Sequence, residues 1–539
     1  MKFRHIPAAL AISSLLLTTT GCKDFFAVNV DPINPTQARL ADLLPVTQAA
    51  MATYFGMGTN GFGPGTSTLV SQYASGRDVG SFTPDGSSFS NQWDGTYTSL
   101  LSNNEQIIKQ GTASGSWAYV GVAQLQKAYA FSIMVDLFGS IPYSQALQGA
   151  AIQAPRFDRD ADIYLGSSDV QSLFSLIDEG LANLDKTSPA LGAEDLIYNG
   201  NLTSWRRFGR TLKLKLYNQI RKSNDSRVGD LATKVRTVLG QELMMSNADD
   251  FQFRYYESTN PDNRNLGYTA DYATPSRENF ISPYFYRLMR GPGSPATTEP
   301  DANYVDPRVP YYFYNQKAGT SPEQVPLQYN SFITVPLGST STAANSTNSN
   351  IRTLPGLYPV GGKFDTNSGG AATASTGKGA APQRFLTYAS RMFTEAEARL
   401  MILNDDAAAA TAFRTGVEAA YNKVNTIAAA DMSPTIPAAT IAARVADAVA
   451  AYNNASGNEA KLRVIMKEKY VAGFGFGPDV YTDYRRTGYP VIKLPGTELN
   501  TQLAGPYPRI LPYYQDDLTT NPNAPAQHNV GTDRVFWDR

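Results

Sequence analysis

Apolar side chains recur at helical spacing along much of this chain, the pattern of helices that pack one face against a core. In the first part, residues 37–248, it predicts helices over residues 40–51, 89–101, 117–138, 163–184 and 205–220. Gly139 follows the most hydrophobic of them, and Pro142 prevents its continuation. Thr203 or Ser204 can cap the helix that begins at Trp205.

Helical spacing returns in the last part of the chain, residues 383–539. There it predicts helices over residues 385–400, 407–424, 438–452 and 461–474, followed by an irregular, aromatic tail. The helices come in consecutive pairs, as in helix-turn-helix repeats of the tetratricopeptide type. We therefore expect an all-α dominated fold built on a scaffold of helical pairs.

Between these parts, residues 249–382 lack helical periodicity and are rich in Pro, Gly, Asn, Tyr and Thr. Tyr311–Tyr314 is the densest aromatic cluster there and is compatible with a strand that has one buried face. Residues 339–349 and 369–379 have the composition of long exposed loops. Loops on a helical scaffold usually carry recognition, so we interpret this region as an irregular ligand-binding insert.

The first 22 residues have the pattern of a bacterial export signal. Lys2 and Arg4 precede an apolar run from Pro7 to Leu17, and small residues then lead to Cys22. Because Cys22 is the only cysteine of the chain and follows Gly21 directly, we expect it to be lipidated. Residues 1–21 are then the signal peptide and residues 22–36 an extended tether. Lipid, not a membrane-spanning helix, would anchor the protein.

The composition argues against several classes of function. The formal net charge is −1 and charged residues make up 17% of the chain, which argues against a nucleic-acid partner. The two histidines are His5, in the signal, and His528, so histidine catalysis and zinc sites lack partners. We expect no metal site, no cofactor and no catalytic residues. A glycosidase that uses only carboxylates stays open.

Five ordered segments resemble the SusD/RagB family of outer-membrane lipoproteins. The start of the mature chain, Cys22–Phe26 and Asn29–Thr36, resembles the family's beginning, and Asp136–Tyr143 resembles its "DLFGDIPYSEA" turn. Phe393–Ala398 resembles its "AEA" helix, and Lys467–Tyr470 with Tyr484–Pro490 resembles its "KYxA…YRRTGYP" segment. Pro508–Tyr513 and Phe536–Asp538 resemble its end. The resemblance therefore covers nearly the whole chain.

The resemblance implies one compact unit with about four tetratricopeptide-like helical pairs and an irregular ligand-binding face. It also implies a surface-exposed lipoprotein of the outer membrane that binds a nutrient. Its implied partner is a SusC-like TonB-dependent β-barrel transporter, over which the lipoprotein closes as a lid. The ligand is predicted to be an oligosaccharide, and a peptide, as in RagB-like relatives, is the alternative.

Glycan binding needs flat apolar faces for sugar C–H groups and neutral hydrogen-bonding groups for hydroxyls. The chain has 31 Tyr, 25 Phe and 4 Trp residues to supply such faces. The resemblance to the SusD/RagB family implies that two regions of the chain converge on one ligand-binding face. The first supplies the candidates Phe62, Tyr73, Arg77, Phe82, Phe89 and Trp93. The second supplies Tyr255, Tyr256, Arg264, Asn265, Tyr268, Tyr272 and Tyr284. Any single tyrosine of the insert is more readily explained by packing than by ligand contact.

Overall fold

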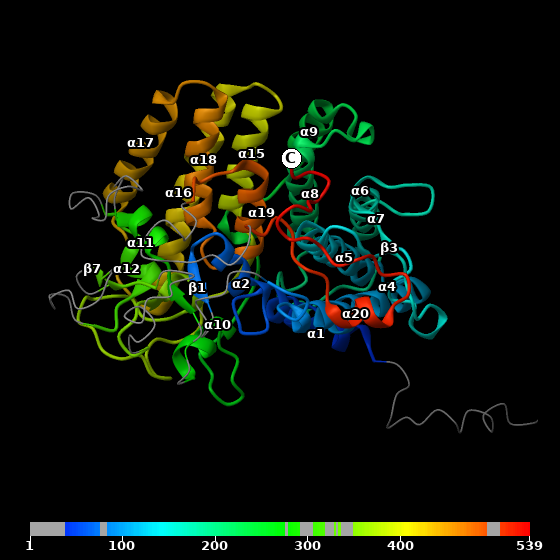
Figure 1. The fold of residues 1–539 in the computed structure, drawn as a ribbon, viewed down its shortest axis with the longest axis horizontal. Helices are drawn as coiled ribbons and strands as arrows, with labels where there is room; N and C mark the ends of the chain where they lie inside the picture. The colour runs from blue at the N-terminus through cyan, green and yellow to red at the C-terminus, as the bar shows by residue number, and fades with distance from the viewer. Residues whose placement is uncertain are drawn as a thin grey trace, which may run out of the picture.

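A computed structural model of the chain describes residues 38–75, 84–274, 277, 279–290, 305–317, 328–329, 332–335, 349–492 and 507–539. The predicted signal peptide, the tether with Cys22, and the candidates Arg77 and Phe82 lie outside these residues. The described chain folds into two groups of helices with the insert beside the C-terminal group (Figure 1).

The N-terminal group has helices distributed over residues 37–248, the part that was predicted to be helical. Its elements are α1 (Leu40–Phe55), α2 (Phe62–Leu69), α3 (Ser90–Gly95), the π-helical turn η2 (Thr96–Leu101), α4 (Ser102–Ser114), α5 (Trp117–Phe138), α6 (Asp160–Leu165), α7 (Leu173–Leu184), α8 (Leu202–Gln219), the 3₁₀ turn η4 (Ile220–Lys222) and α9 (Leu231–Leu239). Helix α5 confirms the predicted bounds, and only Trp117 and Lys127 among its 22 residues are not fully buried. A helix that is apolar on every face belongs inside the molecule.

Two predictions in this group were wrong, and one helix was not predicted. The helix predicted over residues 163–184 is broken into α6 and α7, because Gly166 adopts a positive φ of 85° that ends α6. Asn201, not Thr203 or Ser204, caps α8, since its side chain accepts from the backbone N–H groups of both. The glycine-rich stretch after α1 contains the start of α2, which sequence periodicity had not indicated.

The C-terminal group consists mainly of four long helices that stand side by side in Figure 1. Its elements are α15 (Tyr388–Met401), α16 (Asp406–Asp431), α17 (Ala438–Asn454), α18 (Asn458–Ala472) and α19 (Gly477–Thr487). The last helix, α20 (Gln515–Thr520), returns to the N-terminal group and lies beside α1 (Figure 1). The predicted helix start at Phe385 was wrong, because Gln383–Leu386 form strand β10. The tail was also predicted to be irregular, but Pro478 occupies the first turn of helix α19.

Consecutive helices contact each other in the pairs α4–α5, α7–α8, α15–α16 and α17–α18. The connections of α4–α5, α15–α16 and α17–α18 are short, which requires an antiparallel arrangement, whereas residues 185–201 join α7 to α8. The tetratricopeptide-like, mainly helical fold is thus confirmed. One contiguous hydrophobic core runs through both groups and into the insert. Among the described residues, no helix is both long and apolar enough to cross a membrane.

The insert is made of short elements between the two helical groups. They include the 3₁₀ turn η6 (Asn247–Asp249), β4 (Phe251–Phe253), α10 (Leu266–Tyr268), the π-helical turn η7 (Thr269–Ala273), β5 (Asn279–Ile281), α11 (Pro283–Arg290), α12 (Val309–Tyr312), β6 (Phe313–Tyr314), β9 (Leu354–Pro355) and α14 (Leu357–Val360). Strand β4 pairs with β10, so the two ends of the insert lie side by side. The aromatic cluster Tyr311–Tyr314 is buried and only partly extended, since its first half belongs to α12.

Candidate ligand-binding site

A two-stranded sheet joins the two regions that carry the predicted ligand residues. Strand β1 (Tyr73–Ser75) pairs antiparallel with β5 of the insert, with Tyr73 opposite Ile281 and Ser75 opposite Asn279. Strand β1 therefore ends, at Ser75, beside the insert. Sequence separation of about 200 residues is bridged here by backbone pairing alone.

The candidates of the first region that the structure describes are core residues. Phe62 packs against Phe89 and Phe138, with ring centroids 5.7 Å apart in both cases. Trp93 packs edge-on against Phe138 at 4.9 Å and donates its indole N–H to Asp517 at 2.8 Å. All of these rings are buried, so they support the fold beneath the surface.

The candidate Tyr73 is also fully buried. Its ring packs edge-on against Phe474, with centroids 5.1 Å apart. Burial raises the pKa of the Tyr73 hydroxyl far above its usual value, so the group stays neutral. Tyr73 therefore fixes strand β1 beside the insert.

Two stacked tyrosines of the second region are hydrogen-bonded to the backbone of the insert. Tyr268 and Tyr272 lie with ring centroids 4.9 Å apart and an interplanar angle of 9°. The Tyr268 hydroxyl contacts the carbonyl oxygens of Ala374 and Gly377 at 3.0 and 3.2 Å, and the Tyr272 hydroxyl donates to Pro355 at 2.7 Å. Because both rings are buried, their role in the described structure is to fix this part of the insert.

Arg264 and Asn265 bind the backbone of the same part of the insert. Arg264 donates to the Ala374 carbonyl at 3.1 Å and to the Asp262 carboxylate at 2.9 and 2.7 Å. Asn265 donates to the Ala381 carbonyl at 2.9 Å and caps α10. The sequence thus identified four residues that the structure does bring together, but their side chains bind the protein's own backbone.

Three candidates of the insert reach the surface to different extents. Tyr256 is 59% exposed, the largest exposure among the described candidates. Tyr255 is half-buried and packs edge-on against Phe253 at 5.1 Å. Tyr284 is half-buried and donates to the Val491 carbonyl at 3.1 Å. Only Tyr256 presents most of its ring to solvent.

Residues missed by the sequence analysis form a hydroxyl-rich loop that an ion pair links to the turn of Tyr256. The loop over Tyr268 carries Thr373, whose hydroxyl lies 3.0 Å from that of Ser375 and 3.1 Å from that of Thr376. Lys378 lies 3.7 Å from Glu257 and so links this loop to the Tyr256 turn. We call residues 256–263 and 366–378 the polar rim. The glycine- and serine-rich composition of residues 369–379 had indicated an exposed loop, but nothing in it marked individual side chains.

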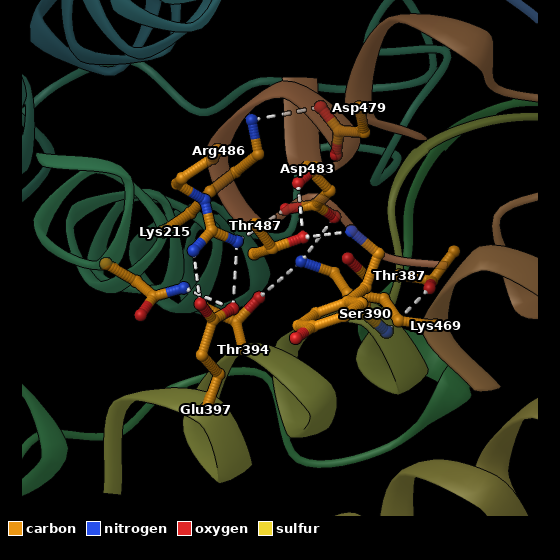
Figure 2. Close-up of polar contacts among 12 residues, drawn as sticks. Lys215, Thr387, Ser390, Thr394, Glu397, Lys469, Asp479, Asp483, Arg486 and Thr487 are labelled. Atoms are coloured by element: carbon orange, nitrogen blue, oxygen red, sulfur yellow. Dashed lines mark hydrogen bonds and ion pairs between the residues drawn. The ribbon is translucent and has the colours of Figure 1, made fainter. Parts of the chain in front are cut away.

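A dense group of charged residues lies inside the scaffold, away from the surface (Figure 2). We call it the ionic network, and it consists of the cations Lys215, Arg221, Lys469 and Arg486 and the carboxylates Glu397, Asp479 and Asp483. Its members come from α8, η4, α15, α18 and α19, so it joins the N-terminal and C-terminal helical groups.

Glu397 is the centre of the ionic network and is 0% exposed. It accepts hydrogen bonds from Arg486, at 2.8 Å for one of two contacts, from Arg221 at 2.9 Å and from Asn218 at 2.9 Å. Burial alone would raise the pKa of the Glu397 carboxyl, but Arg486 and Arg221 outweigh it and hold the pKa well below its usual range. Glu397 is therefore ionised and bonded on both oxygens.

The space beside the ionic network is too small for a sugar. Two cavities of about 40 and about 10 Å³ lie there, lined by Lys469, Asp479 and Asp483 among others. Volumes of this size hold a few water molecules, whereas ligand pockets occupy about 300–1,000 Å³. The network is thus a structural joint between helices, and the polar rim is the candidate site for a ligand.

Asp136, in the segment that resembles the family's "DLFG" turn, is buried beside the ionic network. One of its oxygens accepts from the Tyr164 hydroxyl at 2.7 Å and from the Trp537 indole at 3.0 Å. Burial raises the pKa of the Asp136 carboxyl to about 6, although Lys215 and the Tyr164 hydrogen bond act in the opposite direction. In this fold the carboxyl thus binds a proton more tightly than in the unfolded chain.

This raised pKa predicts a pH-dependent loss of stability. Between about pH 4 and pH 6 the folded chain binds more protons at Asp136 than the unfolded chain does, so the free energy of unfolding falls as the pH rises. The fall amounts to about 3 kcal/mol at most, at about 1.4 kcal/mol for each pKa unit. In Asp136→Asn this fall should be absent when urea unfolding is measured from pH 4 to 7. An unchanged pH profile in the variant would contradict the assignment.

Among the residues that the structure describes, no three His, Cys, Asp or Glu side chains gather in a way that could hold a metal ion. The helical pairs place the chain among mainly helical proteins of tetratricopeptide-like fold. Residues 68–512 match the SusD-like family, described as starch-binding and associating with the outer membrane, and the chain belongs to this family. The predicted resemblance is thereby confirmed.

Solved structures share the fold at low sequence identity. A chitin-binding protein has a TM-score of 0.70 and 21% identity, with 93% of this chain and 100% of that chain covered. A SusD/RagB family protein from Bacteroides thetaiotaomicron has a TM-score of 0.66 and 22% identity, with 93% and 99% covered. A chitin-binding SusD homologue from Flavobacterium johnsoniae has a TM-score of 0.64 and 19% identity, with 92% and 98% covered. No curated protein matches the chain.

Proposed function

We propose that the protein is a cell-surface lipoprotein that captures an oligosaccharide and delivers it to a SusC-like TonB-dependent transporter, for which it acts as the lid. It is a binding protein and not an enzyme. The family's description as starch-binding and outer-membrane-associated supports the glycan and the location. The export signal that ends at the single cysteine supports anchoring by lipid at Cys22.

The polar rim is the observation that carries the glycan assignment. It combines an exposed aromatic ring, Tyr256, with a cluster of neutral hydroxyl groups held in place by buried tyrosines. Sugar rings offer C–H faces and hydroxyl groups, which such a surface matches. Two fold relatives are chitin-binding by name, which supports the same class of ligand.

The roles of the individual candidates divide by burial. We propose that Tyr256 contacts the ligand. Tyr255, its neighbour in the sequence, and Tyr284 on α11 are further proposed ligand residues, because both are partly exposed. Arg264, Asn265, Tyr268 and Tyr272 would act indirectly by holding the rim. Arg77 and Phe82 remain proposed ligand residues, since they follow β1 in the sequence and β1 ends beside the insert.

Calorimetric titration tests the proposed function directly. A chain that starts at Lys23 would be titrated with malto-oligosaccharides, chito-oligosaccharides and a mixed oligopeptide pool, and each mixture would then be checked for cleavage. Saturable binding of one glycan class without cleavage is the expected result. Binding of peptides alone would replace the glycan by a peptide ligand, and cleavage of any glycan would favour the carboxylate-only glycosidase.

Removal of the exposed ring should weaken glycan binding without loosening the fold. We expect Tyr256→Ala to raise the Kd about tenfold, since an aromatic contact is worth about 0.5–1.5 kcal/mol. The melting temperature should stay unchanged because the side chain is 59% exposed. Tyr256→Phe keeps the ring and serves as the matched control, with nearly wild-type affinity. If the wild type, Tyr256→Ala and Tyr256→Phe bind the glycan with equal affinity, Tyr256 does not contact the ligand.

A further inference from the structure

A hollow of about 350 Å³ lies between η6, the start of α15 and the middle of α16. Its lining includes Ser246, Asn247, Tyr388, Thr415, Glu418 and Asn422. None of these residues belongs to the polar rim. The volume falls at the lower end of the range for small-molecule pockets, about 300–1,000 Å³.

Tyr388 supplies an aromatic wall that the backbone holds in place. Its backbone N–H donates to the Asp250 carboxylate at 2.7 Å, and Thr387 before it caps α15 by accepting from the Ser390 N–H at 3.1 Å. The ring is half-buried, and no described residue makes a hydrogen bond with its hydroxyl. Tyr388 thus offers the hollow an apolar ring face and a hydroxyl group that makes no hydrogen bond with a described residue.

Neutral hydrogen-bonding groups stand on the other sides of the hollow. Asn247 donates from its amide to the Ala419 carbonyl at 3.0 Å, while its own carbonyl oxygen finds no donor among the described residues. The Thr415 hydroxyl donates to the Thr411 carbonyl at 3.1 Å, which leaves its oxygen free to accept. Asn422 is exposed about two turns further along α16.

The charge of the hollow selects among ligands. Glu418 is exposed, and no cation pairs with it among the described residues; the lining itself contains no Lys or Arg. A lone carboxylate repels phosphate, sulfate and uronate groups, whereas it accepts hydrogen bonds well from the hydroxyls of a neutral sugar. An aromatic face, neutral amides and one carboxylate together match a neutral pyranose ring.

We propose that this hollow is a second carbohydrate-binding site, which holds one neutral pyranose unit of a longer glycan. The choice of ligand class rests on the proposed function, but the site itself stands on separate residues. Two sites on one protein would retain a polymer more tightly than either site alone, because the second contact is intramolecular.

A fluorescent label beside the hollow reports on this site alone. Because Cys22 is the only cysteine, a chain that starts at Lys23 has none, and every described contact lies within residues 38–539. Thr411→Cys places a single thiol one helical turn before Thr415, at an exposed position outside the lining. The thiol would carry an environment-sensitive dye, and maltoheptaose and chitohexaose would be the probes.

With Tyr256→Ala also present to weaken the rim, either probe should still change the dye signal saturably. Adding Tyr388→Ala should raise the Kd read by the dye about tenfold. Glu418→Ala, at an exposed position, should do the same and covers the case in which Tyr388→Ala fails to fold. Asp447→Ala, an exposed carboxylate on α17, is the matched control and should leave the signal unchanged.

The two proposals fail in distinguishable ways. If calorimetry detects glycan binding to the wild-type chain but the dye signal does not change, the second site is wrong. The proposed ligand site at the polar rim is then unaffected. A dye response that persists unchanged in both Tyr388→Ala and Glu418→Ala would also overturn the second site. If neither heat nor dye signal responds to any glycan, the proposed function and the second site both fall.

Discussion

Replacing Glu397 by glutamine should lower the free energy of unfolding at pH 7 by about 3–5 kcal/mol, the usual cost of breaking a buried ion pair. The carboxylate is 0% exposed and accepts from Arg486 and Arg221. Glutamine would leave Arg486 with Asp483 as its remaining carboxylate and would take from Arg221 the carboxylate it binds. Urea unfolding followed by circular dichroism measures the difference. The effect is large because the network joins helices from both halves of the chain.

The pH dependence of this difference provides a second measurement. Because the folded pKa of Glu397 lies below its ordinary value of 4.5, the stabilisation is present above that pH and is lost as the pH falls. The difference in the free energy of unfolding between the wild type and Glu397→Gln should therefore become smaller at acidic pH. Glu242→Gln is the control, since Glu242 is half exposed beside Arg207 and should change stability little. A difference below about 1 kcal/mol at pH 7 would mean that the network is solvated.

Removing the lipid anchor should move most of the protein from the membrane fraction to the soluble fraction. The test replaces residues 1–22 by an ordinary cleavable secretory signal, so that export continues without Cys22. The reason is physical: each buried CH₂ of an acyl chain contributes about 0.8 kcal/mol to membrane binding. Cell fractionation measures the distribution, and incorporation of a labelled fatty acid into the wild-type chain measures acylation.

Lys23→Ala, one residue beyond the proposed acylation site, is the matched control and should stay in the membrane fraction. If the chain without Cys22 still sediments with membranes after high-salt washing, anchoring by lipid is wrong. Retention through a SusC-like transporter would then be the next explanation, and fractionation of cells that lack such a transporter would distinguish the two.

The sequence predicted the helical scaffold well where packing repeats along the chain. Helix α5 shows why, since its unbroken apolar composition leaves it no position except the interior. Prediction failed where one residue outweighs the pattern. Gly166 breaks a helix whose periodicity otherwise continues, and α2 forms in a glycine-rich segment because neighbouring elements enclose it.

The segments that carried the family resemblance turn out to bind one another. Asp136 accepts from Trp537, and Arg485 donates to the Asp136 carbonyl. Arg486, in the same segment as Arg485, pairs with Glu397 of the "AEA" helix. These residues are buried polar groups whose partners must all be present, so they mark the scaffold clearly in the sequence. They do not touch the polar rim and therefore carry no information about the ligand.

The sequence by itself was enough to predict the helical pairs and the family, both of which are confirmed, whereas the export signal with its single cysteine stays a prediction. Local periodicity and motif order were sufficient for these, because each depends on residues close together in the chain. Only the tertiary structure decided which tyrosines are available to a ligand. Tyr268 and Tyr256 are 12 positions apart and alike in sequence, yet one is buried under residues 374–377 and the other is 59% exposed. Burial of this kind depends on contacts more than 100 residues away, which no local pattern records.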